Sequence, residues 1–278
     1  MIIRAGYTIS YDCPKPTPTI LTLRVHPSRR ADLLAPERLR FSPMLDASDY
    51  TDGFGNACTR LTAPAGRLTI STEFDMFDSG IPDVVPFDVA QHDIQELPDD
   101  VLVYLLSSRY VETDVLSNIA WDLFEGTQPS WTRVQAILNF VHRHIRFDYM
   151  QADNMRSAFG AYLQRVGVCR DFAHLAIAFC RCMNIPARYC TGYLGDIGMP
   201  PNDAPMDFSA WFEVYLGGKW HTADARHNTP RIGRVLMARG RDATDVALST
   251  QFGPSTLAGF VVNTEEVEPT RRQFERTA

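Results

Sequence analysis

The sequence predicts an α+β protein, with a small antiparallel β-sandwich-like domain over residues 1–95 and an α+β core over residues 96–278. The first 95 residues contain short runs of β-branched and aromatic residues separated by turn signals. Residues 99–184 then carry apolar side chains at helical spacing, and three further strand-like runs follow them. This order of strands, helices and strands is typical of an α+β fold.

Four runs in the first part are expected to be strands: "YTISYD", "TILTLRV", "ACTRLTA" and "RLTISTEFDMF". Between them, Asp52-Gly53 and Gly55-Asn56 fit tight turns that need a positive φ. This is a role for the backbone and implies no chemistry. A connection with several prolines leads from residue 80 to the first helix.

Three helices are expected next. Asp99 or Asp100 can cap the first of them, which runs through "VLVYLLSSRY". Ser130 can cap the third. The second and third helices are recognised by their apolar stripes, at Leu116, Ile119, Ala120 and Leu123, and at Trp131, Val134, Leu138 and Val141.

A fourth helix begins at Cys169 and ends at Asn184, before Pro186. Three strand-like runs follow it: "ARYCTGYL", "SAWFEVYL" and "KWHTADA". Gly217-Gly218 joins the last two as a hairpin. If this is a two-residue turn, Leu216 faces Lys219, Trp211 faces Asp224, and Ser209 faces Arg226.

Composition narrows the function classes. The chain has 278 residues and a formal net charge of −6, which disfavours nucleic acid as a partner. No segment approaches the roughly 20 apolar residues of a membrane span, and the N-terminus lacks an apolar signal region, so a cytoplasmic protein is expected. The six cysteines lack the C-x-x-C pairs of a zinc ribbon, so reduced thiols and no metal are expected.

Cys169 has two interpretations. A helix N-terminus lowers a thiol pKa when a positive charge assists, and its free backbone N–H groups can bind an oxyanion, so Cys169 could be a nucleophile. Alternatively, it continues the buried face of its helix with Phe172, Ala176 and Phe179. Helix position does not decide between the two.

The segment "QRVGVCRDFAHLAIAFCRCMNIPARYCTGYL" resembles the core of transglutaminase-like enzymes, and "AWFEVYLGGKWHTADARHN" resembles the block that follows it there. The stretch "DGFGN" and the strand-rich first 95 residues are similar to the β domain of a bacterial subfamily. The resemblance implies a papain-like core with a Cys-His-Asp triad. It assigns Cys169 as nucleophile and Asp224 as the orienting aspartate, and it implies no metal and no organic cofactor.

The sequence departs from this family where a histidine usually precedes Ala-Trp, because Ser209 occupies that position. A serine hydroxyl cannot hold a proton near neutral pH as imidazole does. His227, just past the Asp224 strand, ranks first as a substitute, since the chain can bend back there. His221 is expected on the opposite face of its strand, and His174 is expected to turn away from the thiol.

Other charged groups are given no proton-transfer role. His142 and His144 could be read as a metal pair, but no carboxylate or cysteine spacing completes a site. Asp171 suits the dipole of its helix but opposes a thiolate at Cys169, and Arg170 can offset that repulsion.

Two functions follow from this sequence. The first is a cysteine hydrolase or acyltransferase that acts on peptide or glutamine-type amides through a thioester, with hydrolysis preferred over cross-linking and a peptide or protein as substrate. The second is a catalytically impaired binding or assembly module of the same fold, which the serine at position 209 suggests.

Overall fold

The computed structural model describes residues 1–200 and 206–268. Two four-stranded antiparallel sheets pack together and share one hydrophobic core, to which Ile9, Leu21, Leu61 and Ile70 contribute. The first sheet has the order β14 (Thr256–Val267), β1 (Ile2–Cys13), β6 (Gly66–Phe77) and β3 (Arg40–Ser42). The second has the order β13 (Ser249–Gln251), β2 (Thr17–Leu21), β5 (Ala57–Ala63) and β4 (Ala47–Thr51).

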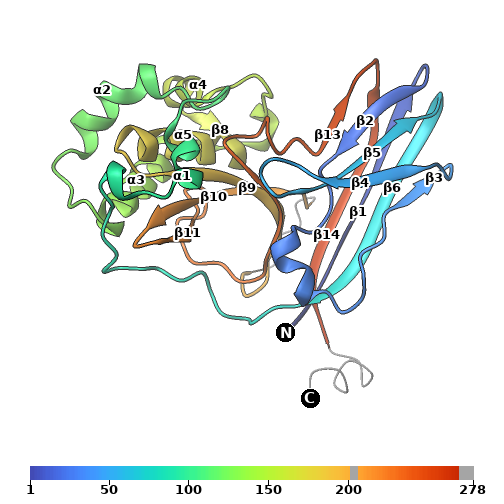
Figure 1. The fold of residues 1–278 in the computed structure, drawn as a ribbon, viewed down its shortest axis with the longest axis horizontal. Helices are drawn as coiled ribbons and strands as arrows, with labels where there is room; N and C mark the ends of the chain where they lie inside the picture. The colour runs from blue at the N-terminus through green and yellow to red at the C-terminus, as the bar shows by residue number, and fades with distance from the viewer. Residues whose placement is uncertain (201–205, 269–278) are drawn as a thin grey trace.

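The β sandwich uses both ends of the chain, as the blue and red strands of Figure 1 show. β14 pairs along the whole of β1, from Ile2 opposite Val267 to Asp12 opposite Thr256. β13 pairs in the same way with β2. The sequence division at residue 95 groups residues 249–267 with the core instead, because strands that pair across more than 200 residues leave no local hairpin signal.

The core consists of helices packed on an antiparallel sheet of order β11-β10-β9-β12. The even-numbered residues of β10, such as Phe212 and Val214, face α5, because successive side chains of a strand alternate between faces. The strands are β9 (Ala187–Leu194), β10 (Ser209–Leu216), β11 (Lys219–Ala223) and β12 (Arg234–Gly240). The helices are α1 (Asp99–Leu102), α2 (Thr113–Phe124), α3 (Trp131–His144), α4 (Ala158–Gln164) and α5 (Cys169–Cys182).

The α+β class predicted from the sequence is confirmed, and so is the register of the hairpin. Leu216 pairs with Lys219 and Phe212 with Ala223, with both turn glycines at positive φ. Ser130 caps α3 by accepting a hydrogen bond from the backbone N–H of Thr132.

A short parallel pair, β7 (Arg146–Phe147) and β8 (Val166–Gly167), leads into α5. In the described part of the chain, no helix has the length and apolarity to cross a membrane.

Two predicted details are wrong. The helix expected through "VLVYLLSSRY" is reduced to α1 and a 3-10 turn, η3 (Val103–Leu105), and neither aspartate caps it, since Asp99 and Asp100 already lie inside α1. In α2, Leu123 is 41% exposed and the neighbouring Phe124 is buried instead. α1 has only four residues, so it has no long apolar stripe from which its limits could be predicted.

Candidate functional site

Cys169 is the first residue of α5, and a buried carboxylate fixes the start of this helix. The backbone N–H of Val168 donates to Asp171 Oδ2 at 2.8 Å. A Cβ at position 167 would lie 2.4 Å from that oxygen, so only glycine allows the approach. The chain therefore enters α5 in one defined geometry, and Cys169 is held directly at the helix N-terminus.

The charge of Asp171 is balanced inside the protein. Burial raises the pKa of Asp171, while the Val168 amide, Arg170 and Arg156 act in the opposite direction. Arg156 Nη1 donates to Asp171 Oδ2 at 3.1 Å, and Arg170 Nη2 lies 3.8 Å from Oδ1. The sequence predicts the contribution of Arg170 but not that of Arg156, which reaches the site from the residue preceding the N-cap of α4.

The Cys169 side chain is half-buried in a cleft of about 630 Å³. The start of β10 forms one wall of this cleft through Asp207, Ser209 and Ala210. The loop 152–154 and the segment 243–248 form other parts of it. Cys169 also packs against the helical core. The thiol is thus neither sealed in apolar packing nor freely exposed, and it can meet a ligand that enters the cleft.

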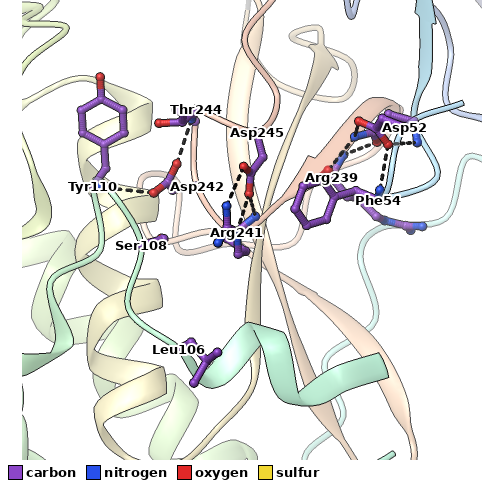
Figure 2. Close-up of polar contacts among 12 residues, drawn as sticks. Asp52, Phe54, Leu106, Ser108, Tyr110, Arg239, Arg241, Asp242, Thr244 and Asp245 are labelled. Carbon is purple, nitrogen blue, oxygen red and sulfur yellow. Dashed lines mark hydrogen bonds and ion pairs between the residues drawn. The ribbon is translucent and has the colours of Figure 1, made fainter. Parts of the chain in front are cut away.

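A hydrogen-bonded turn holds the segment that lines the cleft (Figure 2). Asp242 accepts from the backbone N–H groups of Tyr110 at 2.9 Å and Thr244 at 2.8 Å. His174 Nε2, stacked on the Tyr110 ring, accepts from the backbone N–H of Ala243 at 3.1 Å. His174 is therefore a structural residue that supports the cleft wall.

The electrostatic surroundings of Cys169 favour the neutral thiol. Burial raises the pKa of Cys169, Arg226 and the backbone N–H of Ala210 lower it, and Asp207 and Asp224 raise it. The net direction is upward, so the thiol is mostly protonated at neutral pH. The helix N-terminus alone does not produce the activated thiolate that the sequence position suggests.

Ser209 lies in the cleft wall where the resemblance places a histidine. It is 5% exposed, and its Oγ has no hydrogen-bond partner within residues 1–200 and 206–268. β10 holds it in register opposite Gly192 of β9. A buried hydroxyl at this point can bind a polar ligand atom, but it cannot exchange protons with a thiol near neutral pH.

Asp224 is buried directly after β11 and carries two partners. His227 Nδ1 lies 2.8 Å from Asp224 Oδ2, and the His227 backbone N–H donates to Oδ1 at 3.0 Å. Arg234 Nη2 also donates to Oδ2, at 2.8 Å. Burial acts to raise the pKa of Asp224, but Arg234 and then His227 hold it well below its usual range. The carboxylate is therefore ionised and already paired.

Seven histidines occur in the chain, all at described positions, and none of them lines the Cys169 cleft. Ring nitrogens of three other histidines contact backbone carbonyls: His142 Nδ1 lies 2.9 Å from that of Arg226, His144 Nε2 lies 2.7 Å from that of Tyr162, and His221 Nε2 lies 3.1 Å from that of Leu216. His26 Nδ1 and His92 Nε2 accept from the backbone N–H groups of Ser28 and Gly218. In the described ranges, no three His, Cys, Asp or Glu side chains form a group that could hold a metal ion.

Arg226 is a site residue that the sequence analysis does not single out. Its guanidinium stacks over the ring of Phe147 at 4.0 Å, and Phe147 pairs with Gly167, two residues before Cys169. Arg226 lies far from Cys169 in the sequence. The folded β7–β8 pair brings its guanidinium close enough to the thiol to act on the pKa of Cys169. No local sequence pattern could reveal this.

We expect Arg226→Gln to raise the pKa of Cys169 further, because it removes the cation that opposes burial. The alkylation rate of Cys169 by iodoacetamide at pH 8 should fall about two- to tenfold, a modest effect since Arg226 is half-exposed. Arg143→Gln, at an exposed arginine of α3, is the control and should leave the rate unchanged. Equal alkylation rates in the wild type and both variants would contradict the effect of Arg226 on the pKa of Cys169.

The site is a cysteine at a helix N-terminus in a cleft beside an antiparallel sheet, with a buried aspartate after the next strand. These features define a papain-like α+β protein. Residues 117–225 match the sequence profile of the transglutaminase-like superfamily. Cys169, Ser209 and Asp224 all lie inside the matched range.

Individual proteins are also similar to this chain. The chain is similar to the crystal structure of a candidate cysteine protease from Cytophaga hutchinsonii, with 28% identity, a TM-score of 0.83, and coverage of 97% of this chain and 92% of that one. It is 36% identical over 97 residues to an uncharacterized protein of Mycobacterium leprae, a match that spans 33% of each protein. An uncharacterized protein of Mycobacterium tuberculosis is 26% identical over 75% of this chain and 73% of its own length.

Proposed function

We propose that this protein binds peptide or glutamine-type amide segments in the Cys169 cleft, and that it does so without efficient turnover. The observation that carries the proposal is Ser209. It lies in the wall of the cleft that contains the thiol, where an imidazole would be needed to take up its proton. The cleft, the helix start and the buried aspartate remain, so the surface that receives a substrate in this superfamily is retained while the proton carrier is missing.

The properties of the thiol support this proposal. Burial raises the pKa of Cys169, so the fraction present as thiolate at neutral pH is small. The Asp224 carboxylate, which would orient an imidazole, is instead shared between Arg234 and His227. A thiol in these surroundings can contact a bound amide, but no histidine lines the cleft to accept its proton near neutral pH.

The binding test uses fluorescent peptides of random sequence that contain glutamine, with fluorescence anisotropy as the readout. Ala247→Trp, which fills the cleft, should weaken binding at least tenfold. Ala258→Trp, at an exposed position of β14, is the matched control and should bind like the wild type. Cys169→Ala should also bind like the wild type. A peptide affinity of Ala247→Trp equal to that of the wild type would contradict the proposal.

One observation favours a second function, a cysteine-dependent amidase or acyltransferase of the same specificity. The Asp224–His227 hydrogen bond of 2.8 Å is the aspartate–histidine contact that a triad requires, although His227 does not line the cleft. A movement of His227 on ligand binding would then supply the base, and a thioester at Cys169 would be released by water.

Turnover separates the two functions. For the enzyme, release of ammonia from a blocked glutaminyl peptide should be measurable in the wild type and lost in both Cys169→Ala and His227→Asn. For the binding protein, the wild type should release no more ammonia than Cys169→Ala does. The asparagine is chosen at position 227 because it keeps a hydrogen bond to Asp224 but cannot shuttle protons.

A further inference from the structure

One carboxylate in the wall of the Cys169 cleft has no cationic partner in the described part of the chain. Asp207 is half-buried and lies two residues before Ser209, where the chain enters β10. Its Oδ1 accepts from the backbone N–H of Phe208 at 2.6 Å, and its Oδ2 accepts from the Tyr149 hydroxyl. Both donors are neutral, so they fix the orientation of the carboxylate without balancing its charge.

The cations of this region have other contacts. Among the described residues that line the cleft, only Arg170 carries a positive charge, and its Nη2 donates to the Asp153 carbonyl and lies 3.8 Å from Asp171 Oδ1. Arg226 stacks over the Phe147 ring at 4.0 Å and does not line the cleft. The side chain of Asp153 lies in the lining as well. The charged lining therefore has an excess of negative charge.

An exposed aromatic ring lies beside the Asp207 carboxylate. Tyr149, whose hydroxyl donates to Asp207, is 54% exposed, and no described ring or guanidinium stacks on it. A guanidinium can stack on an aromatic face while its N–H groups donate to a carboxylate. The chain itself contains such an arrangement, because the Arg188 guanidinium lies 3.9 Å from the ring centre of Trp220 and its Nε donates to Glu213 at 2.7 Å.

We propose that Asp207 and Tyr149 bind an arginine side chain of the peptide that occupies the Cys169 cleft. This inference rests on the proposed function and adds the class of peptide, one with an arginine close to the amide residue. A guanidinium suits the site better than an ammonium group, because it is planar and offers two parallel donors to a carboxylate. A metal ion suits it less, since the described residues contain no group of three His, Cys, Asp or Glu side chains that could hold one.

Fluorescence anisotropy with matched peptides tests this inference in the full chain. The probes are short blocked peptides with one glutamine next to an arginine, and the same peptides with citrulline, which keeps the shape of arginine without its charge. The wild type should bind the arginine peptides about five- to tenfold more tightly. Asp207→Asn should bring the two affinities together. Asp122→Asn, at an exposed position of α2, makes the same change in net charge and should keep the full preference.

A second variant tests the aromatic contact. Tyr149→Leu removes the ring and the hydroxyl that orients Asp207, so it should lower the preference for arginine about two- to fivefold. Equal affinities of the wild type for the arginine and citrulline peptides would overturn this inference and leave the proposed function in place. A preference that persists in Asp207→Asn would overturn it as well. If the wild type bound neither peptide, the proposed function and this inference would both fail.

Discussion

Ser209→His should increase the alkylation rate of Cys169 at pH 7 by about tenfold or more. An imidazole at position 209 would enter the cleft beside the thiol and could pair with it as an imidazolium. Each unit by which the pKa of Cys169 falls raises its thiolate fraction at pH 7 about tenfold, although the nucleophilicity of the thiolate falls in part. The measurement is the rate of iodoacetamide alkylation between pH 5 and pH 10.

Two variants control this experiment. Ser209→Asn adds a side chain of similar polarity without a titratable proton, and it should leave the pH profile where it is. Ser209→His combined with Asp224→Asn should lose part of the gain, because the aspartate then no longer stabilises the imidazolium. An alkylation profile for Ser209→His identical to that of the wild type would mean that residue 209 does not reach the thiol.

Arg234→Met should lower the free energy of unfolding at pH 7 by about 3–5 kcal/mol. The substitution leaves the buried carboxylate of Asp224 and the partly buried carboxylate of Asp83 without the guanidinium that lies 2.8 Å from each of them. Urea denaturation of the wild type and the variant measures the difference. Arg67→Met removes an exposed ion pair, with side chains 61% and 47% exposed, and should leave the free energy of unfolding nearly unchanged.

The same pair gives a pH dependence with a defined sign. The pKa of Asp224 lies well below its usual range in the folded protein, so its contribution to stability is complete above the unfolded pKa of about 3.9. This contribution is lost as the pH falls through the folded pKa. In Arg234→Met the buried carboxylate favours protonation, so the difference between the two proteins should shrink from pH 7 to pH 3. A difference that grows toward low pH would contradict this account of Asp224.

Local signals account for the parts of the fold that the sequence predicts. Gly217-Gly218 fixes the hairpin register, and Ser130 and Cys169 mark the starts of two helices. The α+β class follows from such patterns, and the resemblance to transglutaminase-like enzymes rests on the longer segments around Cys169 and Ser209. The roles of Cys169, Asp224 and His227 stay predictions, although the hydrogen bond between Asp224 and His227 shows that the chain does bend back after β11.

The remaining features depend on contacts that no short stretch of sequence contains. Arg234 reaches Asp224 from the next strand, and Arg226 reaches the thiol because Phe147 pairs with Gly167. The pKa of Cys169 shows the same limit, since a helix start predicts a lowered value while the buried surroundings raise it. The position of Cys169 at a helix start predicts only one contribution to its pKa, and the folded environment determines the net shift.

The pairing of β14 with β1 sets an order for synthesis on the ribosome. β1 is translated long before β14, so one of its edges lacks a partner until residues 256–267 have been translated. The residues of the cleft and its helices are all translated before β14, and contacts between such distant segments form slowly. Closing this side of the sandwich therefore has to wait for β14, and until then the unpaired edge of β1 is the one that a chaperone would need to shield.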